Sequence, residues 1–192
     1  MRHLRRLLEL VACAVTLSGC TLVSTSSSPT LVDPNNVPLG LLEPTIPFTD
    51  FAQVHFVTRQ VYMVNHSQHV IGVGRLVTSP PTLAQVMHYV PLGPTATEQA
   101  RGITTEIPST LVVNQANMPT DDGIALVDVS TSLQQLAPDA RRLAVAQLLF
   151  TAVAMGATTG IRISVNQTPF VLPLANGTSV SLITPADLAY LK

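Results

Sequence analysis

The chain has 192 residues, a formal net charge of −1 and no tryptophan, and only 11% of its residues are charged. Proteins that bind nucleic acid carry clustered lysines and arginines on one face. Here Lys192 is the only lysine and no basic cluster follows the first six residues, so nucleic acid is not an expected partner. A polybasic surface for lipid head groups is not supported for the same reason.

The N-terminus has the composition of a secretory signal. Three arginines precede an apolar run from Leu7 to Leu17, which Glu9 interrupts. A signal peptide needs about 7–15 apolar residues, whereas a membrane-spanning helix needs about 20. The run ends in Leu17-Ser18-Gly19-Cys20, which resembles a bacterial lipobox and predicts removal of residues 1–19 and acylation of Cys20. The alternative is an ordinary secretory signal followed by an unrelated cysteine.

The predicted cleavage changes the charge and the thiol content of the chain. Three arginines and one glutamate leave with the signal, so 7 basic and 10 acidic residues remain. Cys13 also leaves and Cys20 is consumed by lipid, so the folded domain has no thiol for a disulfide, a metal site or a nucleophile. We therefore expect a lipid-anchored protein at the extracytoplasmic face of the cell membrane.

Residues 20–50 are predicted to form a flexible tether. The segment is rich in serine and proline, and it offers too little apolar surface to offset the entropy of ordering. The alternative is that part of it, residues 37–42, packs on the domain that follows. Residues 51–192 are long enough to form one domain with a core of its own.

The first half of this domain is predicted to contain a hairpin and a helix. Val-, Phe- and Tyr-rich segments predict strands over 54–64 and 70–77, and Gly72-Val73-Gly74 predicts a β-bulge rather than a phosphate-binding loop. Ser79-Pro80 predicts the start of a helix that stops before Gly93. The polar segment from Gly93 to Pro108 is predicted to be a long loop with one helical turn near residues 96–101.

The second half is predicted to add strands and a core helix. Strands are expected over 111–117 and 124–129, with a turn at Asp121-Asp122-Gly123. A core helix is expected from Pro138 to Gly156, followed by a half-buried strand over 160–166. A turn at 175–177 and a short helix after the capping box at 184–187 complete the chain. The order predicts an α+β fold, a mostly antiparallel sheet with two helices packed on one face.

Few residues have the spacing of a metal or catalytic site. His66 and His69 have a metal-like separation, but zinc needs three or four ligands, so both are predicted to be turn residues. Serine-nucleophile motifs are absent. Asp128 can work as an acid or base with Glu98 or Glu106, or it can hydrogen-bond the next loop from a strand end, which we favour. We therefore expect no catalytic residue, no metal and no cofactor.

Several motifs together resemble the GerMN domain family. Its signature loop is similar to Gly93-Pro94-Thr95, Glu98, Gly102-Ile103-Thr104-Thr105 and Ile107-Pro108. Similar positions elsewhere are Val61-Tyr62, Arg75, Val127-Asp128-Val129-Ser130, Leu143, Ala144, Gln147, Thr151, Val165-Asn166 and Pro169. The resemblance covers about residues 61–188. It departs from the family at Glu106, where a small residue is usual, and at Asn166-Gln167, where an acidic residue and glycine are usual.

The resemblance implies an α-β-β-α-β core similar to that of ring-building modules in secretion-type assemblies. It also implies a non-enzymatic role, as an interaction or accessory module in cell-envelope assembly or signalling. Envelope proteins are then the expected partners, and homo-oligomers stay open. Two other functions stay open as well: binding of a small ligand or cell-wall glycan, which the lack of tryptophan disfavours, and hydrolysis.

The loop from Gly93 to Pro108 is the predicted partner-binding surface, because ordered long loops are often functional. The alternative is an irregular cover over the sheet edge. Its predicted structural corners are Gly93, Pro94, Gly102 and Pro108, and its predicted exposed contact residues are Glu98, Arg101 and Glu106.

Overall fold

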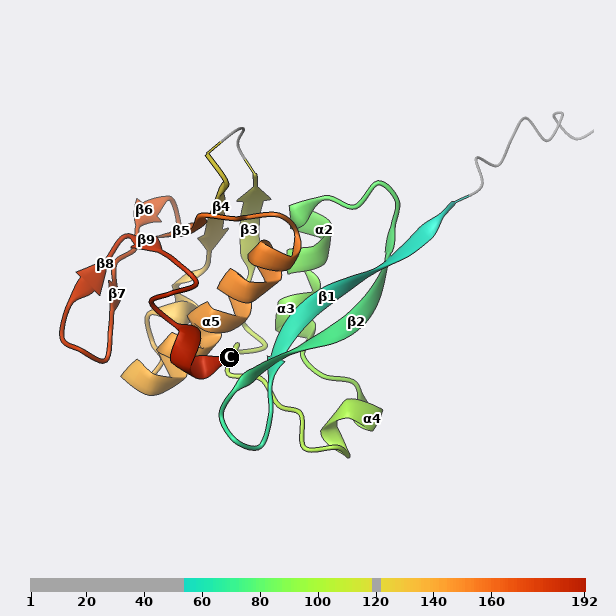
Figure 1. Ribbon diagram of the computed structural model, residues 1–192, viewed down its shortest axis with the longest axis horizontal. Helices are drawn as coiled ribbons and strands as arrows, with labels where there is room; N and C mark the ends of the chain where they lie inside the picture. Colours follow the sequence, from blue (N-terminus) through green and yellow to red (C-terminus); the bar gives the residue numbers. More distant parts are fainter. Residues whose placement is uncertain (1–53, 119–121) are drawn as a thin grey trace, which may run out of the picture. The chain divides into compact units, whose positions relative to one another are not determined.

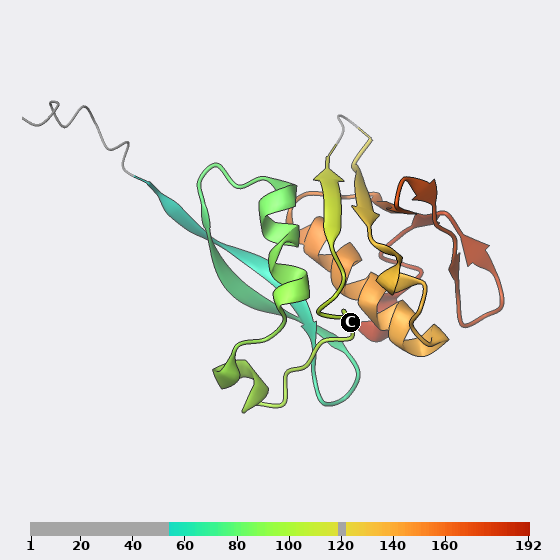
Figure 2. The ribbon, with the colours of Figure 1, turned by 180° about the vertical axis from the view of Figure 1, so that it is seen from behind.

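The computed structural model describes residues 54–118 and 122–192. The predicted signal peptide, Cys20 and the predicted tether lie outside these residues, as does Asp121 of the predicted turn. Figure 1 shows a long hairpin of β1 and β2, a central helix α5 and a second sheet, and Figure 2 shows the same elements from behind.

The predicted hairpin is confirmed. β1 (Phe56–Val64) and β2 (Val70–Thr78) pair antiparallel in an unbroken register from Phe56 opposite Thr78 to Val64 opposite Val70. The predicted bulge at Gly72 and Gly74 is wrong. These glycines instead give room to side chains of the facing strand, since a Cβ on Gly72 would lie 2.7 Å from Oε1 of Gln60.

The first helical segment begins later than predicted and is divided in two. α2 (Leu83–Met87) has Thr82 as its N-cap, with a capping box completed by Gln85, so the predicted start at Ser79-Pro80 is wrong. A hydroxyl that bonds the N3 amide and a glutamine that returns to the cap amide satisfy two free donors, and Ser79 makes no such pair. α3 (Tyr89–Leu92) follows directly and ends at Gly93, as predicted.

The second sheet has the order β3-β4-β5-β6, and β9 also pairs with β5. Its strands are β3 (Val113–Asn117), β4 (Ile124–Val129), β5 (Gly160–Val165), β6 (Thr168–Pro169) and β9 (Leu182–Ile183). The β4–β5 pair is parallel, and the other pairs among the described strands are antiparallel. A register shift between Val113 and Gln115 places a bulge in β3, so Asn114 is the extra residue.

The core helix α5 (Pro138–Ala154) follows its prediction closely and ends before Gly156, which has φ +110°. Ten consecutive residues, from Leu143 to Ala152, are buried. α5 contacts β1 and β2 on one side and β5 on another, so it lies between the hairpin and the sheet (Figure 1). A helix covered on several sides needs apolar residues all round, which explains its uniform composition.

The C-terminal segment forms short elements rather than the predicted helix. β7 (Leu172–Pro173) and β8 (Ser179–Val180) flank the predicted turn at Asn176 and Gly177. Asp187 accepts hydrogen bonds from the amide and hydroxyl of Thr184, but only a 3-10 turn, Ala189–Leu191, follows. Another 3-10 turn, Thr131–Leu133, precedes α5. The predicted α+β class is confirmed, and within the described residues no helix has the length and apolarity needed to cross a membrane.

Candidate functional site

The loop from Gly93 to Pro108 is held to the core by one buried side chain. Gln147, on α5, has no solvent exposure. Its Oε1 accepts from the amide of Glu106 at 2.9 Å, and its Nε2 donates to Oγ1 of Thr105 at 3.1 Å. Nε2 also donates to the carbonyl of Tyr62 on β1 at 3.1 Å. One glutamine therefore fixes the loop, the helix and the hairpin relative to one another.

Thr151, one turn further along α5, completes this network. Its hydroxyl donates to the carbonyl of Gln147 at 2.7 Å and accepts from the amide of Tyr62 at 3.0 Å. The amide and the carbonyl of Tyr62, on the outer edge of β1, are thus both paired with side chains of α5. Beyond it, Val64 and Thr104 exchange two backbone hydrogen bonds of 2.9 and 2.7 Å, so the loop adds one bridge to the edge of β1. Buried polar groups satisfied in this way specify a single arrangement of the elements.

The N-terminal half of the loop is fixed by an ion pair. Arg75 on β2 donates through Nη1 and Nη2 to the two carboxylate oxygens of Glu98, each at 2.7 Å. The side chains are 11% and 17% exposed. Arg75 lies opposite Arg59 in the hairpin, so the carboxylate also offsets a repulsion between like charges. A bidentate arginine–carboxylate pair of this kind is both directional and strong.

Glu98 has a second structural task in α4 (Ala96–Gln99). Its Oε2 accepts from the amide of Thr95 at 2.8 Å, and the hydroxyl of Thr95 accepts from the amide of Glu98, which forms a capping box. The hydrogen bond from Arg75 is the main reason that the pKa of Glu98 is lowered from 4.5 to about 2. Burial works in the opposite direction, and the bonds from Thr95 and the charge of Arg75 lower the pKa further.

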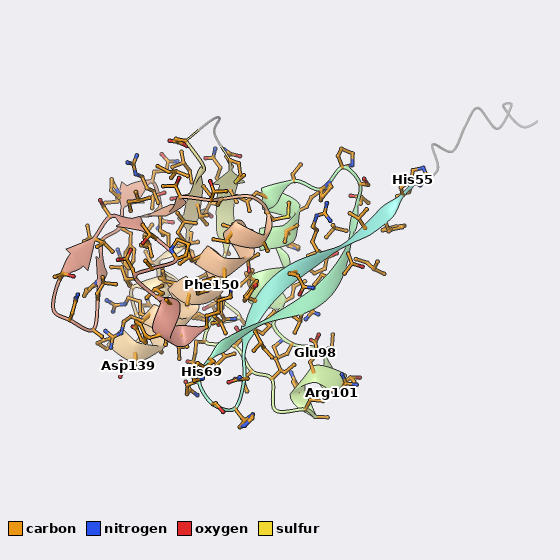
Figure 3. The ribbon with its side chains drawn as sticks, in the orientation of Figure 1. His55, His69, Glu98, Arg101, Asp139 and Phe150 are labelled. Atoms are coloured by element: carbon orange, nitrogen blue, oxygen red, sulfur yellow. The ribbon has the colours of Figure 1, made fainter. Side chains whose placement is uncertain are left out.

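The predicted contact residues therefore differ in position. Glu98 is not the exposed contact residue that the sequence predicts, because Arg75 and Thr95 occupy its carboxylate. Arg101 is exposed and Glu106 is half-buried. Figure 3 shows Glu98 and Arg101 on the same part of the loop, at α4. Sequence reasoning missed the partners of Glu98, although the capping-box spacing from Thr95 to Glu98 was a readable signal.

The predicted corners have the conformations that their residue types allow. Gly93 has φ +70° and Gly102 has φ +78°, where residues with a Cβ are strained. Pro94 follows Gly93 just before the N-cap of α4, and the carbonyl of Pro108 accepts from the amide of Leu111 in a closing turn. The loop is thus an ordered structure with one short helix, as predicted.

A second candidate site lies on the face of the sheet turned away from the buried side. Asp128 is 9% exposed there. It accepts from Oγ of Ser164 at 2.5 Å, the amide of Gln167 at 2.7 Å and Nδ2 of Asn114 at 2.9 Å. Burial alone raises the pKa of Asp128, but these three hydrogen bonds outweigh burial and leave the pKa lowered. A carboxylate held in this way is a weak base for Ser164.

Asp128 borders a hollow of about 420 Å³. The hollow is lined by Gln115, Leu126, Val127, Asp128, Arg162, Ile163, Ser164, Gln167 and Pro169. Neither Glu98 nor Glu106 lines it or bonds Asp128, so the structure does not bring together the acid–base pair considered from the sequence. The favoured interpretation, a strand-end aspartate bonded to the next loop, describes its contact with Gln167.

His66 and His69 are exposed residues at the hairpin turn, where Oδ1 of Asn65 accepts from the amide of His69. Figure 3 places His69 at this end of the hairpin and His55 at the other. Within residues 54–118 and 122–192, no three His, Cys, Asp or Glu side chains are grouped so that they could hold a metal ion.

Comparison with known proteins identifies the class of this domain. The model of the Germane family, described as sporulation and spore germination, matches residues 60–170. Because this match spans more than half of the chain, the chain belongs to that family. No curated protein matches the chain significantly.

The fold is supported by a solved structure of the same class. The tandem GerMN domains of the sporulation protein GerM from Bacillus subtilis match with a TM-score of 0.52 and 15% identity, over 69% of this chain and 48% of that one. This chain thus spans about half the length of the tandem structure. The first GerMN domain of the same protein matches with a TM-score of 0.49 and 16% identity, over 68% and 99% of the two chains. A candidate lipoprotein from Clostridium perfringens matches with a TM-score of 0.43 and 14% identity, over 74% and 95%.

Proposed function

We propose that this GerMN-domain protein is a lipid-anchored, extracytoplasmic, non-enzymatic module that acts by protein–protein contact in cell-envelope assembly or signalling. The observation that carries the proposal is the way the loop from Gly93 to Pro108 is built. Buried polar groups of α5 and an ion pair from β2 fix the loop, yet α4 at its outer end has no buried residue.

This construction fits a surface that is presented to a partner. Ordering a long loop costs conformational entropy at every residue, and here the cost is offset by hydrogen bonds to Gln147 and Arg75. A mere cover over the sheet would bury its own side chains, whereas Ala96, Thr97 and Gln99 of α4 are exposed to solvent. A preorganised loop loses less freedom when a partner binds, which raises affinity.

The partner-facing residue of this loop is Arg101. Glu98 is occupied by Arg75, so its charge is already neutralised within the domain. Arg101 is exposed, and no ion pair with it is found among the described residues. Glu106 contributes its amide to Gln147 and leaves its carboxylate for the rim of the same surface. Such a surface suits a partner with an acidic patch opposite Arg101.

The test is crosslinking of the full-length protein in its native membrane, with charge reversal at two arginines. Arg101→Glu should reduce recovery of crosslinked partners, while Arg162→Glu, at another exposed position on β5, should not. Thermal melting should change little in both variants, as surface substitutions usually alter stability by at most about 0.5 kcal/mol. Unchanged recovery with Arg101→Glu in a folded protein would place the interface elsewhere.

The lipid anchor is proposed from the lipobox at Cys20 and has its own test. Cys20→Ser should leave uncleaved precursor or release the protein into the medium. Mature-length Cys20→Ser protein that still fractionates with the membrane would contradict lipid anchoring.

A second candidate function is binding of a small ligand or cell-wall glycan, which the hollow beside Asp128 favours. Arg162, Gln115 and Ser164 there offer polar groups next to the apolar side chain of Leu126, which is 42% exposed. The same pair of arginine variants separates the two functions. Loss of glycan retention with Arg162→Glu and not with Arg101→Glu would favour this second candidate.

A further inference from the structure

Large exposed apolar side chains gather at the open end of the hairpin. Val54, Phe56 and Leu76 are 64%, 61% and 65% exposed. Side chains alternate between the two faces of a strand, so Phe56 and Thr58 share one face of β1, and Val54 lies two residues before Phe56. Leu76 is the direct partner of Thr58, which places it on that face as a diagonal neighbour of Phe56. We call Val54, Phe56 and Leu76 the hairpin patch.

A shallow hollow of about 280 Å³ continues the hairpin patch towards α2 and α3. Phe56, Leu76 and Tyr89 give it apolar walls, and His88 lies at its border. The hydroxyl of Tyr89 donates to the carbonyl of Leu76 at 3.0 Å, so an otherwise free edge group of β2 is paired. The carbonyl of Leu76 is therefore not left unpaired beside this apolar surface.

This part of the chain is also free of negative charge. Residues 54–97 contain no Asp or Glu, whereas every Asp and Glu in the described residues lies at or beyond Glu98. The same segment holds Arg59, Arg75 and all four described histidines. Of these, His55 and His88 lie beside the hairpin patch, His55 in sequence and His88 at the hollow. The segment that carries the hairpin patch therefore brings no carboxylate of its own to an anionic surface, and its two arginines do not oppose such a surface.

We propose that the hairpin patch and its hollow dock on the lipid bilayer surface, with Phe56 and Leu76 entering the head-group region. The proposal rests on the proposed lipid anchor at Cys20. The described chain begins at Val54, inside the patch, and 33 residues separate Cys20 from Val54. The patch is thus the part of the domain that follows most directly on the anchored segment.

With the lipid anchor in place, a weak contact between the hairpin patch and the bilayer is enough for docking. Two or three apolar side chains bind a free protein to a membrane only marginally, so without the anchor we expect measurable binding only at high lipid concentration. The predicted tether keeps the domain within reach of the bilayer and converts docking into an intramolecular step at a high effective concentration. The bilayer, rather than a second copy or a partner protein, is the occupant that the position of Val54 in the chain favours.

The experiment uses the full-length protein reconstituted in phosphatidylcholine–phosphatidylglycerol vesicles. An environment-sensitive NBD fluorophore is attached at Leu76→Cys or, as a matched control, at Leu126→Cys on the open sheet face. Emission at position 76 should shift to the blue and be quenched by spin-labelled lipid, and emission at position 126 should show neither effect. Absence of quenching at position 76, equal quenching at both, or a shift at position 76 that depends on protein concentration without lipid would each overturn the proposal.

Thiol labelling of the parent protein distinguishes failure of the docking proposal from failure of the proposed lipid anchor. If Cys20 is acylated, parent protein takes up no thiol label, and a negative result at position 76 then overturns docking alone. If the parent takes up label, the anchor fails. Docking is then decided with the Cys13→Ser, Cys20→Ser chain at high lipid, where quenching at position 76 supports it and absence of quenching overturns it.

Vesicle partition of that unanchored chain gives a second readout. Phe56→Ser should lower partition by about tenfold or more, because burial of a phenylalanine side chain contributes more than one tenfold step. Val112→Ser, at an exposed position outside the hairpin, should leave partition unchanged. Equal partition of Phe56→Ser and the parent would contradict entry of Phe56 into the bilayer.

Discussion

The two ends of the β1–β2 hairpin are made of similar residues and have opposite surroundings. At the end near the turn, Val61, Met63 and Val64 are fully buried, and Tyr62 packs on Phe150 of α5 with ring centroids 5.7 Å apart. At the open end, Val77 on one face is still buried, whereas Phe56 and Leu76 on the other face are more than half exposed. Apolar residues in a strand therefore do not by themselves indicate core, since their burial depends on what covers them.

The two ends of the hairpin are also expected to differ in what they contribute, the turn end to stability and the open end to binding. The turn end is fixed by Gln147 and Thr151, whose hydrogen bonds already pair the amide and the carbonyl of Tyr62. The open end has an apolar face that nothing in the described residues covers. We expect substitutions at the turn end to change the free energy of unfolding, and substitutions at the open end to change binding.

The largest expected effect comes from removing the buried amide that fixes the turn end. Gln147→Leu keeps the volume but leaves the carbonyl of Tyr62 and the amide of Glu106 without their partner. Each buried group left unpaired costs about 1–3 kcal/mol, so the free energy of unfolding should fall by about 3 kcal/mol. Urea denaturation measures it. Gln135→Leu, at an exposed position before α5, is the matched control and should stay within about 0.5 kcal/mol.

A smaller effect is expected from Glu98, and it depends on pH. The pKa of Glu98 is lowered from 4.5 to about 2, chiefly by the hydrogen bond from Arg75. A pKa lowered in the folded state means that the ion pair stabilises the protein fully above about pH 4.5 and loses this contribution as the pH falls towards 2. The full shift corresponds to about 3 kcal/mol. Partial exposure of both side chains reduces our expectation to about 1–2 kcal/mol.

Glu98→Gln is the variant that isolates this contribution. Its free energy of unfolding should lie about 1–2 kcal/mol below that of the parent at pH 6, and the two should converge towards pH 2.5. Asp128 also has a lowered pKa, so the parent and the variant share the pH dependence that Asp128 causes, and only their difference is informative. A constant difference across this pH range would mean that the charge of Glu98 does not stabilise the fold.

Substitutions at Gly102 test whether the loop between α4 and the turn end of the hairpin is rigid. Its φ of +78° is unfavourable for a β-branched residue, although a Cβ would meet nothing closer than 3.7 Å. Gly102→Val should therefore cost about 1–2 kcal/mol through backbone strain, while Gly102→Asn should cost less, because asparagine tolerates this region. Thermal melting compares the two. Equal melting temperatures for Val and Asn would show that the loop relaxes around position 102.

Much of the fold could be predicted because local signals and burial agree. Alternation in the hairpin, the apolar run in α5 and the glycine after it all give the observed elements. The start of the first helix was predicted wrongly because two N-terminal signals compete there. Ser79-Pro80 and Thr82 with Gln85 are both plausible starts, and only the second forms a capping box. Local sequence does not decide such a choice when each motif is acceptable alone.

The candidate site could be predicted less well, because its residues act through contacts between distant segments. The loop and its corners follow from glycine and proline spacing, but the burial of Glu98 depends on Arg75, 23 residues away. Gln147 reaches a loop 41 residues away, and nothing in its own helix indicates that contact. A charged residue in a polar loop is expected to be exposed until its partner is known, which is why the sequence alone places Glu98 on the contact surface.

The smallest expected effect is at the open end of the hairpin. Val54→Thr and Val61→Thr make the same chemical change at two positions of opposite burial, because Val54 is 64% exposed and Val61 is fully buried. Val61→Thr places a hydroxyl in the core and should cost about 1–3 kcal/mol. Val54→Thr should alter the free energy of unfolding by at most about 0.5 kcal/mol, because its side chain already meets water.

Urea denaturation of the two threonine variants in the absence of membrane measures this contrast. A cost at Val54 comparable to that at Val61 would mean that the open end is covered in solution, and the hairpin patch would then be core rather than a docking surface. If Val54→Thr leaves the free energy of unfolding unchanged but weakens vesicle partition, the side chain of Val54 contributes to membrane binding and not to folding. That combination is what the exposed position of Val54 leads us to expect, because a side chain that contributes nothing to folding can still contribute to an interface.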